Sequence, residues 1–202
     1  MNEQDQTPRS REGEKFIEES LEGPYQFDDA EGGEDVIEIP NGTIVVRQQQ
    51  DELIDAIAAF IYAEASSSVS KFGDFQLALS NAKDLEPLYE RLMYDPIVRG
   101  LPWQSTHLWC VDGTSECTLV KEIIVDHSGI PSAQVHRTLP EVVEGKDPPR
   151  LDCVVLQKHC ASLDVLSVRT VVLVSSTVDE CKQVASTCTH ATVRGFVRQE
   201  NH

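Results

Sequence analysis

The sequence predicts a doubly wound α/β protein, with helices on both faces of a mostly parallel sheet in a Rossmann-like three-layer arrangement. Short apolar stretches alternate with stretches of helical periodicity, which is the pattern of a parallel α/β sheet. The segments 153–156 and 170–174 are short and apolar, as strands buried on both faces are. A disordered acidic tail precedes this domain, because residues 1–40 hold 13 Asp or Glu and only 3 Lys or Arg.

Each element has a local signal. The expected strands are 43–47, 75–80, 106–111, 153–156, 170–174 and an edge strand at 191–197. Apolar residues recur at helical spacing over 53–61, 85–92 and 119–124. We expect Asp51 to cap the first of these helices and Gly129 to end the third. Thr177 and Glu180 form a capping box for a fourth helix over 178–186.

The chain divides into a disordered acidic tail, residues 1–39, and one α/β domain, residues 40–202, that begins near Thr43. The length fits one domain once the tail is removed. The tail also carries scattered apolar residues, which leave open a short partner-binding segment beside a simple solvated tail: Phe16, Ile17, Leu21, Tyr25 and Phe27.

Charge and hydropathy limit the partners. The net charge of −17 argues against nucleic acid, whose binding depends on neutralising phosphates with Lys and Arg. No apolar run reaches the roughly 20 residues of a membrane span, and the polar N-terminus resembles neither a signal nor a transit peptide. We therefore expect no membrane partner and a location in the cytosol, or in cytosol and nucleus. The sequon Asn41-Gly42-Thr43 would then be inert.

The six cysteines are expected to be unpaired thiols, since disulfides are rare in the cytosol. They lie at 110, 117, 153, 160, 181 and 188, without the two-to-four-residue spacing of zinc ligands, so no metal is expected. A weaker alternative is a metal site made by Cys160, Cys188, His159 and His190.

Residues 77–92, LALSNAKDLEPLYERL, resemble the strand–loop–helix of 6-phosphogluconolactonases. In that family the strand ends in L-S-G-G-S and the helix carries P-x-P-L-Y-E-x-L. The helix half matches at Pro87, Leu88, Tyr89, Glu90 and Leu92. The glycine pair is replaced by Asn81 and Ala82.

Further matches follow in the family's order up to about residue 185. Residues 101–109 resemble I-P-W-x-x-V-H-x-x-W, residues 130–137 resemble I-P-x-x-N-V-H-R, and residues 159–163 retain H-x-A-S-L. Only Asp112 remains of G-D-E-R, and the glycine-rich segment before His159 is missing, as is the long connection after H-x-A-S-L. The chain is thus similar to a truncated and degenerate member of the 6-phosphogluconolactonase/glucosamine-6-phosphate isomerase family.

This resemblance implies where a site would lie. Lactone hydrolysis needs a base, an oxyanion donor and a grip on the phosphate. The vestigial candidates are His159 and Asp112 for catalysis, and Ser80, Asn81 and Lys83 for phosphate. Because the glycines that allow close backbone approach are replaced, we expect no catalytic residue and no cofactor. The expected function is that of a pseudoenzyme that binds an unidentified protein. The alternative is residual sugar-phosphate binding, or a lactone (carboxylic ester) hydrolase with His159 as base.

Overall fold

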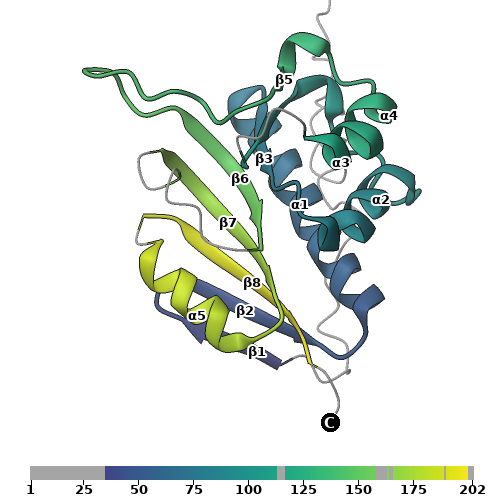
Figure 1. Cartoon of the computed structure of the whole chain (residues 1–202), viewed down its shortest axis with the longest axis vertical. Helices are drawn as coiled ribbons and strands as arrows, with labels where there is room; N and C mark the ends of the chain where they lie inside the picture. Colours follow the sequence, from purple (N-terminus) through teal and green to yellow (C-terminus); the bar gives the residue numbers. More distant parts are fainter. Residues whose placement is uncertain (1–34, 113–116, 158–162, 164–165, 189, 200–202) are drawn as a thin grey trace, which may run out of the picture. The chain divides into compact units, whose positions relative to one another are not determined.

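The computed structural model describes residues 35–112, 117–157, 163, 166–188 and 190–199. Within these residues the chain forms one eight-stranded sheet in the order β1-β2-β8-β7-β6-β3-β4-β5 (Figure 1). The strands are β1 Asp35–Ile39, β2 Gly42–Arg47, β3 Phe75–Leu79, β4 Thr106–Cys110, β5 Val135–His136, β6 Arg150–Leu156, β7 Ser167–Ser175 and β8 Thr192–Arg198. Only the β1–β2 pair is antiparallel, so the expected mostly parallel sheet is confirmed.

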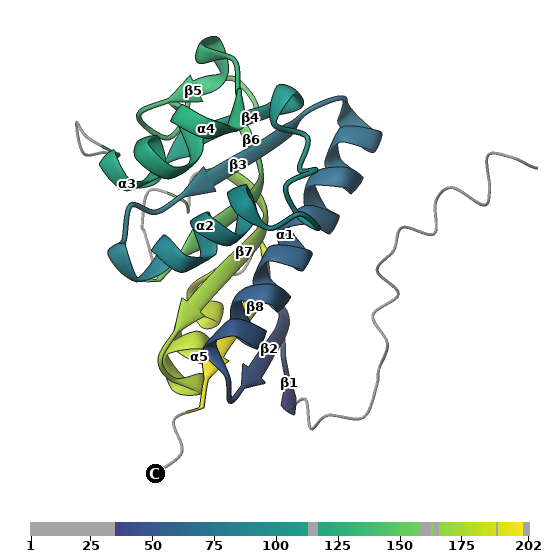
Figure 2. The same ribbon diagram turned by 90° about the vertical axis from the view of Figure 1, so that its right-hand side faces the viewer.

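Helices cover both faces of the sheet, as expected (Figure 2). The helical segments are α1 Gln50–Phe72, η1 Lys83–Leu85, α2 Glu86–Tyr94, η2 Trp103–Ser105, α3 Thr118–Val120, η3 Lys121–Val125, α4 Asp126–Ser128, η4 Ser132–Gln134 and α5 Val178–Thr187. Segments α3, η3 and α4 run on as one helix with a π-helical middle, which ends at the left-handed Gly129. One of the two hydrogen bonds of the expected capping box is confirmed, because Thr177 Oγ1 accepts from the Glu180 N–H.

The two faces have separate apolar cores. On one face α1, α2 and η3 pack against inward residues such as Leu77, Val155 and Phe196. On the other face α5 packs through Cys181 and Ala185. Among the described residues, helix α1 is long and apolar enough to cross a membrane by length and composition alone, and seven of its residues are buried.

Three local expectations are wrong. Residues 35–39 form β1, so regular structure begins before Thr43. Asp51 lies inside the first turn of α1 and the cap position is Gln49. Strand β8 is internal, between β2 and β7, although it was expected at an edge. In this internal strand, Arg194 lies over the Phe60 ring and donates to Thr43 Oγ1.

The turn that joins β1 to β2 is tied to the end of α5. Asn41 Nδ2 donates to the carbonyls of Ala185 at 3.0 Å and Cys188 at 2.8 Å. A Cβ on Gly42 would come 1.8 Å from the Val193 carbonyl oxygen, so only glycine fits there. The Asn-Gly pair of the sequon is therefore a structural joint, and its amide is already engaged.

A buried carboxylate organises the amino end of the sheet. Asp152 on β6 is fully buried, with Oδ1 3.1 Å from both Arg150 Nε and Arg169 Nη1. Its other oxygen accepts from the Gln76 N–H at 2.9 Å. The three strands β3, β6 and β7 are thus bound together by one side chain.

Candidate functional site

The ends of β3 and β4 lie side by side, because Leu79 pairs in register with Cys110. The fold therefore brings together three of the predicted site residues, Ser80 and Asn81 from the end of β3 and Asp112 from the end of β4. Ser80 Oγ donates to Asp112 Oδ2 at 3.1 Å, and the Asn81 N–H donates to the same oxygen. Ser80 is 7% exposed, whereas Asp112 is exposed at the surface.

The Asn81 side chain caps the N-terminus of α3, the helix that follows β4. Its Oδ1 accepts from the Leu119 N–H at 3.0 Å and from the Val120 N–H at 3.4 Å. These are donors at a helix N-terminus, which in a phosphate site would face the ligand. Here a side chain of the protein satisfies them.

Tyr89 lies on α2, in the helix motif that matches the family, and it contacts the end of β3. Its hydroxyl donates to the Ser80 carbonyl, and its side chain is fully buried. Burial, with the nearby charge of Asp112, raises the pKa of Tyr89 well above its ordinary value. Tyr89 therefore stays protonated and serves as a hydrogen-bond donor that joins α2 to β3.

Cys110 and Cys117 form a disulfide, with their Cα atoms 6.5 Å apart. The expectation of six unpaired thiols is therefore wrong for this pair. The disulfide links the end of β4 to the residue before α3, and so closes the loop that carries Asp112. The cysteine spacing in the sequence did not indicate this disulfide, because the approach of Cys117 to Cys110 depends on where α3 docks.

Cys181, on α5, is a separate case. Burial raises the pKa of its thiol to about 11, which makes that thiol unreactive.

Lys83 is separated from the other phosphate candidates. It lines a groove of about 1070 Å³ at the carboxyl end of β6, β7 and β8, and the groove lining includes neither Ser80, Asn81 nor Asp112. Apolar side chains from both faces of the sheet contribute to it: Leu53, Ile54, Ile57, Leu85, Leu88, Val174 and Val184. Its charged residues are Lys83, Arg198, Asp84, Glu86, Glu90 and Glu180, so carboxylates outnumber cations by four to two.

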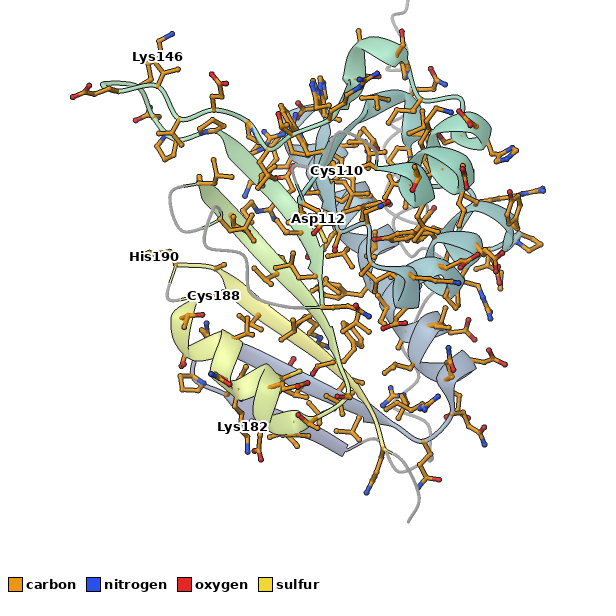
Figure 3. All side chains as sticks on the ribbon, viewed as in Figure 1. Cys110, Asp112, Lys146, Lys182, Cys188 and His190 are labelled. Carbon is orange, nitrogen blue, oxygen red and sulfur yellow. A yellow bond between two sulfur atoms is a disulfide. The ribbon has the colours of Figure 1, made fainter. Side chains whose placement is uncertain are left out.

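The remaining site predictions have different outcomes. His159 and Cys160 lie outside the described residues, so the base candidate has no structural account. Cys188 is buried at the end of α5 and His190 is exposed before β8. Figure 3 shows both of them well away from Cys110 and Asp112. Among the described residues no group of three or more His, Cys, Asp or Glu could hold a metal ion.

An unassigned aromatic cluster lies at the β4–β5 edge. His107 Nδ1 is 3.2 Å from His136 Nε2, and the two ring planes differ by only 8°. Trp109 stacks on His136 with ring centroids 3.7 Å apart, and its indole N–H donates to Gln76 Oε1. All three aromatic residues belong to the motifs that carry the family resemblance, but their positions in the sequence do not indicate that they contact one another.

Known proteins resemble this chain over part of its sequence and in its fold. No family model matches the chain. It is 40% identical over 68 residues to the human GDH/6PGL endoplasmic bifunctional protein, and 42% identical over 62 residues to the protein of that name from Oryctolagus cuniculus. These matches cover 34% and 31% of this chain, but only 8% of each relative.

Solved structures match over much more of the chain. The 6-phosphogluconolactonase from Leishmania guyanensis has a TM-score of 0.58 and 13% identity, covering 78% of this chain and 96% of that one. The Shewanella baltica enzyme has a TM-score of 0.53 and 14% identity, covering 80% and 99%. The fold is therefore that of the 6-phosphogluconolactonases. This chain is similar to them in fold, and to the bifunctional proteins over part of its sequence, which confirms the resemblance drawn from the motifs.

Proposed function

We propose that this chain is a catalytically inactive 6-phosphogluconolactonase-like protein that works as a protein-interaction module. The observation that carries the first half is the internal use of donors at the strand end. The N–H groups of Asn81, Leu119 and Val120 all donate to side chains of the protein itself. A phosphate would have to displace both Asn81 Oδ1 and the Asp112 carboxylate.

Electrostatics points the same way. The Asp112 carboxylate accepts from Ser80 and Asn81, so it holds negative charge where a phosphate would need donors. Like charges within a few ångströms disfavour each other. The one remaining cation among the phosphate candidates, Lys83, lies in a separate groove where carboxylates predominate.

A coupled assay with 6-phosphogluconolactone tests the inactivity. We expect the pure chain to match the spontaneous rate, because a positioned base alone contributes about 10²–10⁴ and an oxyanion donor about 10²–10³. The His159→Ala variant should then have the same rate. Hydrolysis above background that is lost in His159→Ala would refute the proposal and establish the hydrolase alternative.

Sugar-phosphate binding is measured separately, by isothermal titration with 6-phosphogluconate. We expect no heat of binding to the native chain. Saturable binding that Lys83→Ala abolishes would favour the alternative of a residual sugar-phosphate site. What supports the interaction role is that the strand-end N–H donors are used within the protein while the sheet and its helices are intact.

A further inference from the structure

The groove at the carboxyl end of β6, β7 and β8 is an unassigned surface that suits a larger ligand than a sugar phosphate. Its volume of about 1070 Å³ is at the upper limit of the roughly 300–1,000 Å³ of small-molecule pockets. Its apolar floor is supplied by α1, η1, α2, the end of β7 and α5, so it spans both faces of the sheet. An apolar floor with a polar rim is the usual composition of a protein-binding surface.

The sheet topology restricts the conformation of the occupant. Strands β6, β7 and β8 are internal, and each is hydrogen-bonded to a neighbour on both sides. No strand edge is open in the groove, so a partner cannot add a strand there. An occupant must satisfy its own backbone hydrogen bonds, as a helix does.

The charge of the rim restricts the side chains of the occupant. Three helix N-termini lie at the groove, at the starts of α1, of η1 with α2, and of α5. Each carries a partial positive charge of about half a unit, which favours anions. Each start is offset by acid in its first turn: Asp51 and Glu52 on α1, Asp84 and Glu86 at η1 and α2, and Asp179 and Glu180 on α5. Glu90 adds a further carboxylate to the lining. The four carboxylates that line the groove outnumber its two cations, Lys83 and Arg198, so the rim carries a net negative charge within a chain of net charge −17.

We infer that this groove binds an amphipathic helix of a partner protein, with apolar residues on one face and Lys or Arg flanking them. The apolar face packs on the partly exposed Pro87, Val174 and Val184. The basic residues approach Glu86 and Glu90. The overall negative charge attracts such a helix and increases its association rate. This inference rests on the proposed interaction function and specifies the partner's chemistry.

The test uses the full chain and two synthetic peptides of one spacing, a Leu/Lys and a Leu/Glu amphipathic helix. Fluorescence anisotropy should show binding of the Leu/Lys peptide and none of the Leu/Glu peptide. The Glu86→Lys/Glu90→Lys variant should weaken binding about tenfold or more, a change of ~1.4 kcal/mol or above. The control, Glu122→Lys/Glu144→Lys, changes two exposed acids outside the groove by the same charge and should weaken it less than twofold.

Chemical-shift mapping locates the peptide. We expect perturbed amides at Gln157, Val174, Gln183 and Val184, with both variants retaining the native thermal midpoint. Equal weakening in both variants, or shifts confined to other surfaces, would overturn the groove assignment. The lactonase assay distinguishes a failure of this inference from a failure of the proposed function. A chain that has no lactonase activity and binds no peptide in the groove would still be an inactive relative, one that binds its partner at another surface.

Discussion

His107 Nδ1 and His136 Nε2 are 3.2 Å apart, and their rings lie edge to edge in nearly one plane. The ring centroids are 5.5 Å apart, which is close to the 3.2 Å contact plus the two centre-to-nitrogen distances. One imidazole therefore donates to the lone pair of the other. The bond fixes the edge strand β5 to β4, and it needs one of the two nitrogens to be unprotonated.

The first prediction concerns pH. Burial, with the charge of His107, lowers the pKa of His136. A lowered folded-state pKa means that the unfolded chain binds more protons, so stability is full above about pH 6.5 and falls as pH drops towards the folded pKa. The test variant changes only His136, so Asp74, which interacts with His107, and Trp109, which stacks on position 136, are both retained. In His136→Gln, the free energy of unfolding should fall less between pH 7.5 and 5.5.

Urea unfolding at several pH values measures this difference. His190→Gln removes an exposed histidine and is the matched control. An unchanged pH slope in His136→Gln would show that the histidine pair does not contribute.

The second prediction concerns Asn41. Asn41→Ala removes donors to two carbonyls at the end of α5, so it should destabilise the domain by about 1–3 kcal/mol. Gln48→Ala, at an exposed position two residues before α1 begins, should stay within about 0.5 kcal/mol. Thermal unfolding of both variants provides the comparison, and equal midpoints would contradict the role of Asn41.

The third prediction concerns the buried carboxylate. Asp152→Ala removes the carboxylate that Arg150 and Arg169 share, but Arg150 keeps Asp74 and Arg169 keeps Glu64. Because neither charge is left unpaired and both are about one-third exposed, we expect a loss of about 1–3 kcal/mol, below the cost of an unpaired buried charge. Asp152→Asn keeps an acceptor for the Gln76 N–H and should lose less. Denaturant unfolding that ranks Asn below Ala in stability would be inconsistent with this network.

The fourth prediction concerns the disulfide. Closing a loop of roughly eight residues stabilises a fold by about 2–3 kcal/mol in the chain-entropy model. Reductant should therefore lower the thermal midpoint of the native chain but leave Cys110→Ser/Cys117→Ser unchanged. Mass spectrometry of a non-reduced digest should yield a peptide that joins Cys110 to Cys117. Finding both thiols alkylated without reduction would refute the pairing.

Local patterns in the sequence determined much of the fold. The apolar spacing over 85–92 gave α2, and the Thr177 capping box gave the start of α5, because these signals act within one turn of a helix. The uninterrupted apolar stretches gave β6 and β7 as central parallel strands. The motif order gave the family resemblance and the strand-end residues Ser80, Asn81 and Asp112.

Tertiary structure decided what depends on distant partners. Strand β8 is internal because β2, about 150 positions earlier, pairs with it. Asn41 is a joint because α5 ends beside it, and Asn81 caps α3 because β3 and β4 end side by side. Lys83 shares a loop with Ser80 but lines a different surface. A side chain's neighbours are set by the docking of whole elements, and the periodicity of its own segment carries no information about that docking.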